Sequence, residues 1–142
     1  MKSFLSADNQ FVVLNLAHGE LLLESLQQAA DDLHLGTAAI VTGYGALSRL
    51  HIHYGKHVGR RPEAVFAVYE EPLELCALTG VVADNQVHAH IIASNGRASF
   101  GGHLEPETIV CWLAEIVLQR LPLNLTRERD EYGIPMLKEK PE

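Results

Sequence analysis

Residues 87–104 read VHAHIIASNGRASFGGHL, and this stretch decides the architecture of the chain. Residues 87–94 place apolar side chains at alternate positions, which is typical of a strand with one buried face. The Asn95-Gly96 pair that follows favours a tight turn, and a short second strand is expected around residues 97–100. The stretch therefore predicts a β-hairpin.

Three histidines belong to this hairpin. In a strand, residues i and i+2 project from the same face, so His88 and His90 are expected side by side, and the turn brings His103 back towards them. Three neutral imidazoles with an open fourth position are the usual geometry for zinc or another divalent metal, where bound water becomes acidic. The alternative is a group of hydrogen-bonded histidines at a subunit contact without metal.

Other residues near the histidines have weaker signals. The Gly101-Gly102 pair allows close approach of backbone beside His103. Glu74 and Glu115 lie within apolar strands, where a carboxylate must be exposed, paired or perturbed, and either could support a histidine ligand. A second pair, His51 and His53, has no third ligand nearby in sequence and is predicted to have no special role.

The rest of the chain alternates between strand patterns and one helical pattern. Apolar positions recur at helical spacing from Glu20 to Leu35, and Gly36 suits the C-terminal cap of that helix. Residues 108–118 fit either a helix or a buried strand, and the segment after Pro122 is expected to be a surface strand or turn and a loose tail. Strands are expected at residues 11–16, 37–42, 46–54, 64–69 and 73–82, with Gly43 and Gly45 closing the second of these. The chain is thus predicted to be a single domain, residues 1–142, with its core at about 11–121.

Charge and hydropathy limit the function classes. Eighteen acidic and eleven basic side chains give a net charge of −7, which opposes general attraction to DNA. A local stretch without acidic residues carries Arg49, Lys56, Arg60 and Arg61, and these are the candidate nucleic-acid contacts. No apolar run approaches the roughly 18 to 20 residues that span a bilayer. We therefore expect a cytoplasmic protein with no membrane partner.

The motifs taken together resemble the PPC family, the plant and prokaryote conserved domain. Residues 71–80 (EPLELCALTG) resemble the family's E-x-x-E-x-x-x-L-x-G segment, His88-Ala89-His90 its HxH motif, and residues 96–104 its segment ending in GGHL. The run 103–118 also follows the family's closing segment, which is a β-strand, and the resemblance therefore favours a strand at 108–118. It covers about residues 11–121.

This resemblance implies an α+β fold, mainly antiparallel sheet flanked by helix, assembled as a homotrimer. It also implies a DNA-binding label that comes from plant members with AT-hooks. The 142 residues contain no Arg-Gly-Arg-Pro core of that kind, and Gly59-Arg60-Arg61-Pro62 is only a distant echo.

Three functional hypotheses follow. The first is a homo-oligomer with a divalent-metal or small-molecule ligand site on His88, His90 and His103, near a subunit boundary. The second is a DNA-binding, transcription-associated protein that uses the local basic stretch. The third is a metal-dependent hydrolase with Glu74 or Glu115 as the acid–base group.

Overall fold

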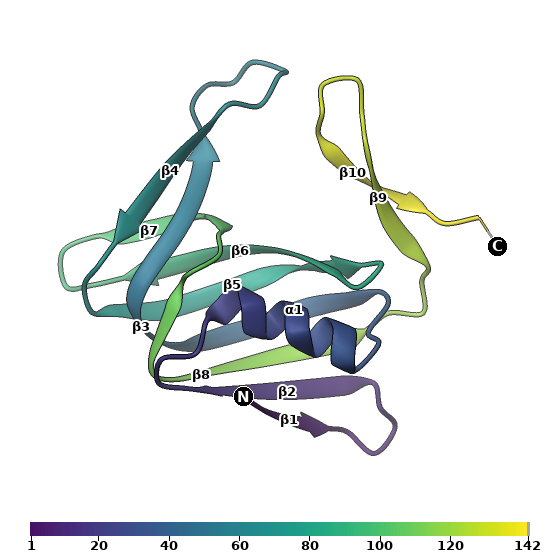
Figure 1. Ribbon diagram of the computed structural model, residues 1–142, viewed down its shortest axis with the longest axis horizontal. Coiled ribbons are helices and arrows are strands. Elements are labelled where there is room, and N and C mark those ends of the chain that lie inside the picture. The colour runs from purple at the N-terminus through teal and green to yellow at the C-terminus, as the bar shows by residue number, and fades with distance from the viewer. Residues whose placement is uncertain (142) are drawn as a thin grey trace.

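The computed structural model describes residues 1–141 and shows a mainly antiparallel sheet covered on one face by one short helix (Figure 1). This confirms the fold class. The elements in chain order are β1 (Lys2–Leu5), β2 (Phe11–Ala17), α1 (Leu22–Asp32), β3 (Ala38–Gly55), β4 (Ala64–Tyr69), β5 (Leu73–Ala83), β6 (Gln86–Ser94), β7 (Ser99–Leu104), β8 (Ile109–Arg120), β9 (Leu125–Arg129) and β10 (Pro135–Glu139).

The large sheet has eight strands, in the order β1-β2-β8-β3-β5-β6-β7 with β4 on β3. The end of β3 also pairs with β7, through Ile52 opposite Leu104 and His53 opposite His103. Strands β3, β5, β6 and β7 therefore form a closed ring of hydrogen-bonded neighbours. This closure brings residues about fifty positions apart in the sequence into one row.

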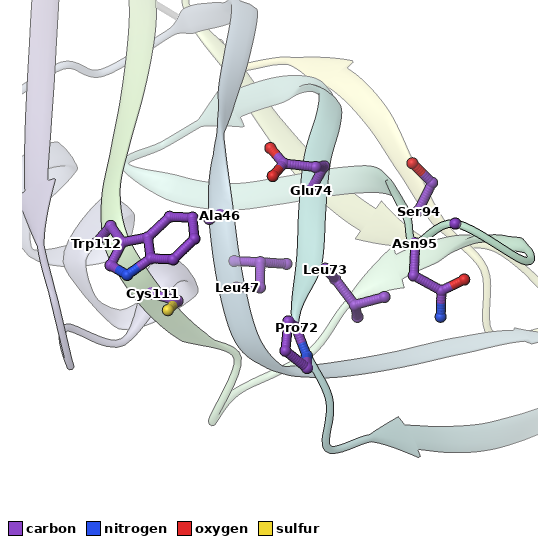
Figure 2. Close-up of a pocket in the computed structure, with 10 residues that line it drawn as sticks. Ala46, Leu47, Pro72, Leu73, Glu74, Ser94, Asn95, Cys111 and Trp112 are labelled. Atoms are coloured by element: carbon purple, nitrogen blue, oxygen red, sulfur yellow. The ribbon is translucent and has the colours of Figure 1, made fainter.

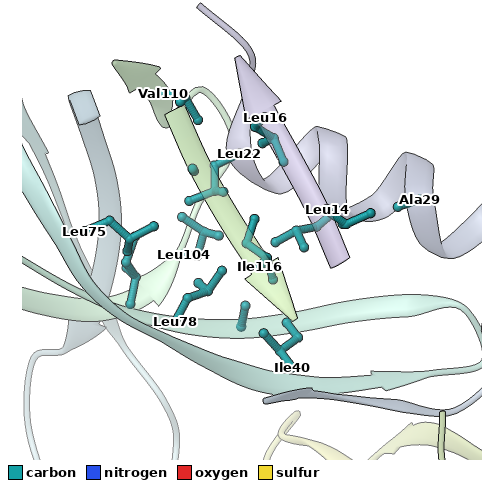
Figure 3. Packing of buried hydrophobic residues seen from close by; sticks show 14 of the residues in the cluster. Leu14, Leu16, Leu22, Ala29, Ile40, Leu75, Leu78, Leu104, Val110 and Ile116 are labelled. Atoms are coloured by element: carbon teal, nitrogen blue, oxygen red, sulfur yellow. The ribbon is translucent and has the colours of Figure 1, made fainter. Parts of the chain in front are cut away.

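Helix α1 covers one face of the sheet because its apolar positions follow helical spacing. Leu22, Leu26, Ala29 and Ala30 are all buried. They belong to one buried cluster with alternate side chains of β2 and β8, among them Leu14, Leu16 and Ile116, and Figure 3 shows Leu22 and Ala29 in this cluster. Burying a Leu or Ile side chain of this kind contributes about 1.5–3 kcal/mol. This is the hydrophobic core on which the sheet rests.

Strand β3 is one continuous strand of 18 residues, so the prediction of two strands separated at Gly43 and Gly45 was wrong. The two glycines do not interrupt the strand but allow neighbouring strands to approach it closely. A Cβ at Gly45, where φ is +148°, would lie 2.3 Å from the carbonyl oxygen of Leu113 on β8. A Cβ at Gly43 would lie 2.9 Å from the Cβ of Leu78. Both positions thus lack a side chain so that β5 and β8 can pack against β3.

The segment after Pro122 forms a hairpin, β9–β10, where the sequence predicted a surface strand or turn and a loose tail. Its base is held by the rest of the domain. The backbone N–H of Leu125 donates to Thr37 Oγ1 at 3.0 Å, and Lys140 forms an ion pair with Asp84 in the β5–β6 turn. Strand β1, which the sequence pattern did not predict, pairs with β2 at the sheet edge.

Two hairpins rise from the same side of the sheet, and their tips approach each other in Figure 1. One consists of the end of β3 with β4, and the other is β9–β10. The guanidinium of Arg60, in the first tip, donates to the hydroxyl of Tyr132, in the second, at 2.9 Å. The same guanidinium lies 5.3 Å from the centre of the Tyr132 ring. Within residues 1–141, no helix has the length and apolar character needed to cross a membrane.

Candidate metal centre

Strand register places four histidines on one surface of the sheet. His90 on β6 is directly opposite His103 on β7, and His103 is directly opposite His53 on β3. His88 lies two residues before His90 and therefore projects from the same face. The intervening residues, such as Ala89 and Leu104, are buried in the core. The four imidazoles consequently form a row on the outer face, and we call them the histidine cluster.

The rings of the cluster lie close together. The centroids of His53 and His103 are 4.5 Å apart with the rings stacked. His88 lies 4.7 Å from His103 and edge-on to it, and His90 lies 5.5 Å from both His88 and His103. The three histidines predicted from the sequence are thus brought together, and His103 is at the centre of the group.

Glu105 is the carboxylate that contacts this cluster. Its Oε1 accepts hydrogen bonds from Nδ1 of His53 at 2.5 Å and from Nδ1 of His103 at 2.9 Å. Since an ionised carboxylate is only an acceptor, both imidazoles carry their proton on Nδ1 and keep a lone pair on Nε2. A carboxylate that holds the far nitrogen in this way is the usual support of a metal-binding histidine.

A second arrangement is also compatible with the geometry. One donor atom each from His53, His103 and Glu105 all lie within 4.8 Å of one another. In that case the carboxylate would itself be a ligand, beside two imidazoles. Both arrangements use the same three residues at the centre of the site.

Burial keeps two imidazoles of the cluster neutral. Loss of solvent lowers the pKa of His88 to about 4, with further lowering by the charge of Arg127 and by the neighbouring imidazoles. Burial also lowers the pKa of His103, although the Glu105 carboxylate acts in the opposite direction. At neutral pH both rings are therefore uncharged, which is the form that binds metal.

Glycine at position 102 lets strands β7 and β3 meet. A Cβ there would lie 2.5 Å from the carbonyl oxygen of His53. The close approach predicted for the Gly101-Gly102 pair is thus confirmed at Gly102. Its consequence is that β7 can pair with β3, which is what places His53 beside His103.

The sequence showed no third ligand near His51 and His53, but the structure brings His103 and Glu105 beside His53. His51 points elsewhere, with Nδ1 2.9 Å from the carbonyl oxygen of Pro106. His53 packs against the ring of Phe66 on one side and against His103 on the other. The sequence signal that could have found it is the HxH spacing itself, but only together with the β3–β7 pairing.

Glu74 and Glu115 lie away from the cluster. Glu115 accepts hydrogen bonds from the hydroxyl of Tyr44 and, at 3.4 Å, from the side-chain amide of Asn15. The Glu115 carboxylate raises the pKa of Tyr44. Glu74 lines a separate surface cavity of about 290 Å³ beside Trp112, which Figure 2 shows. The supporting carboxylate expected from the sequence is present in the structure, but it is Glu105.

The basic residues singled out in the sequence are largely matched by neighbours. Arg49 lies 3.3 Å from both Glu70 and Glu107. Lys56 forms an ion pair with Glu63. Of the other two basic residues, Arg60 contacts Tyr132 and Arg61 is exposed. Two of the four charges are therefore already neutralised within the chain.

Residues 6–122 match the model of the Plants and Prokaryotes Conserved (PCC) domain. The chain belongs to this family. The sequence resemblance to the PPC family is thereby confirmed, and the matched region contains the whole histidine cluster together with Glu105. The C-terminal hairpin lies outside the matched region.

Solved structures similar to this PCC domain share its fold. They include a protein from Bacteroides thetaiotaomicron named as a candidate DNA-binding protein, with a TM-score of 0.83, 17% identity, and coverage of 96% of this chain and 97% of that one. The metal-containing protein AF0104 from Archaeoglobus fulgidus has a TM-score of 0.80, 23% identity, and coverage of 97% of each chain. A plant- and prokaryote-conserved protein from Pyrococcus horikoshii has a TM-score of 0.79, 23% identity, and coverage of 99% and 96%.

Two curated relatives are much longer proteins. The PCC domain is 29% identical over 110 residues to the bifunctional protein GlmU of Synechococcus sp. strain JA-2-3B'a(2-13), which covers 77% of this chain and 16% of the relative. It is 27% identical over 119 residues to GlmU of strain JA-3-3Ab, which covers 82% and 18%. The chain thus spans less than a fifth of the length of the curated relatives it matches.

Proposed function

We propose that this protein binds a divalent transition-metal ion, zinc or a related ion, at the histidine cluster. The observation that carries the proposal is the single Glu105 oxygen that accepts from Nδ1 of both His53 and His103. It leaves the Nε2 atoms of both rings as acceptors, and the rings of His88 and His90 lie 4.7 and 5.5 Å from the ring of His103.

The residues fit such an ion by their chemistry. Imidazole is a preferred ligand of zinc, copper and nickel, and a neutral ring is required. Because the pKa of His88 is about 4, its ring is already neutral at neutral pH and loses no proton when a metal binds. The similar fold of AF0104 from Archaeoglobus fulgidus, a protein named as metal-containing, supports the same proposal.

The decisive experiment compares two histidines of one strand. Zinc affinity is measured by competition with a chromophoric chelator for the wild type, for His53→Ala and for His51→Ala. The proposal predicts a loss of at least about tenfold for His53→Ala, since one ligand is removed, and little change for His51→Ala. Equal affinities for the two variants, or no zinc binding by the wild type, would contradict it.

Binding of metal is a more limited proposal than hydrolysis. The metal-dependent hydrolase considered from the sequence needs a carboxylate free to move a proton. In this structure Glu105 is held between two imidazoles, and Glu74 and Glu115 lie at other places on the sheet. The geometry therefore favours metal binding over hydrolysis.

DNA binding is a second candidate, since two structural neighbours are named as candidate DNA-binding proteins. The support from this chain is limited to Arg60 and Arg61, because Arg49 and Lys56 are paired with carboxylates. Phosphate contacts make affinity fall steeply as salt rises. Absence of binding to duplex DNA at low ionic strength would remove this candidate.

We also propose that the chain assembles with further copies of itself. The resemblance to the PPC family implies a trimer. Cross-strand partners Phe4 and Val13 are exposed on the sheet face opposite α1, beside Val117. An apolar surface of this kind is often covered by a partner. Sedimentation equilibrium should give three times the mass of one chain, and a monomer would contradict the proposal.

A further inference from the structure

The side chain of Trp112, the only tryptophan of the chain, is exposed at an irregular point of β8. It is 72% exposed, and its backbone lies in the left-handed region, with φ at +65°, which a bulky residue rarely adopts. The pairing of β8 with β3 shifts register here and leaves Trp112 and Leu113 without partners on β3. The backbone N–H of Trp112 donates instead to Nδ1 of His18 at 3.2 Å. Strained backbone of this kind is common at binding sites.

Two surface hollows meet at Trp112. One, of about 290 Å³, is shown in Figure 2, and the other, of about 310 Å³, is also lined by Tyr44. Both are lined by Ala46, Glu74 and Trp112. Ala46 pairs with Glu74 on β5 and with Cys111 on β8. Since neighbouring strands are about 4.8 Å apart, the backbones on the two sides of Ala46 are separated by about 10 Å, and the small alanine leaves the space between them free.

Glu74 brings a negative charge to these hollows. Its side chain is exposed, and none of the ion pairs within residues 1–141 involves it. Glu115, by contrast, already accepts a hydrogen bond from the hydroxyl of Tyr44. Figure 2 shows the carboxylate of Glu74 and the indole ring of Trp112 on the two sides of Ala46. The hollows therefore present an unpaired carboxylate together with a large aromatic ring.

We propose that the hollows beside Trp112 bind a small organic ammonium ion. The face of a tryptophan ring attracts cations, and an ammonium group with alkyl substituents packs on it while keeping its charge. The carboxylate of Glu74 adds Coulomb attraction from the other side of Ala46. Among residues 1–141, the lining of both hollows includes no member of the histidine cluster, so this inference is independent of the metal proposal.

The fluorescence of Trp112 reports directly on this site, because the chain has one tryptophan. Tetramethylammonium chloride is titrated into the protein at constant ionic strength, with sodium chloride as the salt that it replaces. The neutral control is tert-butyl alcohol, which has a similar size and shape. We expect a saturable change of emission with tetramethylammonium and none with the alcohol. Butylammonium chloride, titrated in the same way, distinguishes a primary amine from a methylated one.

Variants separate the charge from the ring, with calorimetry as the measurement common to all of them. Glu74→Gln should weaken the binding of tetramethylammonium about fivefold or more, because the charge opposite the cation is lost. Glu139→Gln removes an exposed carboxylate of β10 instead and should bind as the wild type does. Trp112→Leu should lose a similar factor, whereas Trp112→Phe should be intermediate, since it keeps a smaller ring. Circular dichroism establishes that each variant is folded.

Each outcome bears on the inference. Tighter binding of tetramethylammonium than of butylammonium assigns a methylated ammonium group, and the reverse assigns a primary amine. Wild-type protein that binds neither ion overturns the inference, and so does equal affinity of the wild type and Glu74→Gln. A response to tert-butyl alcohol as large as the response to tetramethylammonium would also contradict it, because the site would then be apolar without selecting a cation.

Discussion

Replacing Glu105 by Gln tests the role of the carboxylate that holds the cluster. The change keeps the shape of the side chain but removes its charge, so that its oxygen accepts from His53 and His103 only as a neutral amide. Glu105 is 17% exposed, and one oxygen forms both contacts, at 2.5 and 2.9 Å. The two imidazoles would then be less basic and less firmly oriented as ligands.

The expected loss follows from these contacts. A hydrogen bond to a charged group contributes about 1.5–3 kcal/mol, and a neutral acceptor about half of that. For the two contacts together we expect metal binding to weaken by about 1.5–3 kcal/mol, which is roughly 10- to 100-fold in the dissociation constant. Chelator competition at neutral pH measures this change directly.

Glu107→Gln is the matched control for this prediction. It removes the same charge two residues further along, where the carboxylate contacts Arg49 and not an imidazole. Its zinc affinity should stay within about twofold of the wild type, because exposed charges are screened by salt. Equal losses of zinc affinity in Glu105→Gln and Glu107→Gln would refute this prediction, because a change of net charge alone would then explain both.

Two further predictions concern pH and backbone packing. The pKa of His88 falls from 6.5 in the unfolded chain to about 4 in the folded protein. Between these pH values only the unfolded state binds the proton. Metal-free protein therefore loses stability as the pH falls from 6.5 towards 4. The full shift corresponds to about 3 kcal/mol in the free energy of unfolding, and we expect roughly half of that for a partly exposed ring. Urea unfolding at several pH values should show a smaller loss of stability for His88→Asn than for the wild type. The same dependence on pH in both proteins would contradict this prediction. Gly102→Ala forces a Cβ to 2.5 Å from the carbonyl of His53 and should cost about 1–3 kcal/mol and weaken zinc binding, whereas Gly96→Ala, with nothing within 4 Å, should do neither. Equal unfolding midpoints for the two glycine variants would count against the β3–β7 pairing.

Much of the fold follows from local sequence patterns. The alternation in residues 87–94 and the Asn95-Gly96 pair predict the β6–β7 hairpin, and that hairpin places His90 opposite His103. Apolar residues at helical spacing predict α1, and these residues form its buried face. These features depend on neighbours a few residues apart, which is why the sequence alone is enough to find them.

The rest of the site depends on long-range register, which sequence patterns do not contain. Nothing local to His53 shows that β3 continues past Gly45 and ends beside β7. The role of Glu105 depends on the same pairing, since its oxygen bridges two strands. The β9–β10 hairpin is a further case, since only contacts with distant residues, Thr37 at its base and Arg60 at its tip, fix its place.

Two short motifs of the family, HxH and GGHL, are informative when they occur together. HxH supplies two imidazoles from one strand, and GGHL supplies a third imidazole together with the glycine that lets its strand meet β3. Each motif alone is common. Their combination matters because strand pairing brings them, with His53, onto one surface.

Metal content of untagged protein, measured by plasma mass spectrometry, tests the central claim most directly. The measurement is made on the wild type and on His103→Ala, because His103 is the imidazole that contacts the other three and Glu105. We predict about one zinc or similar ion per chain in the wild type and its loss in the variant. Folded wild-type protein that contains no metal, and takes none up when zinc is supplied, would contradict it.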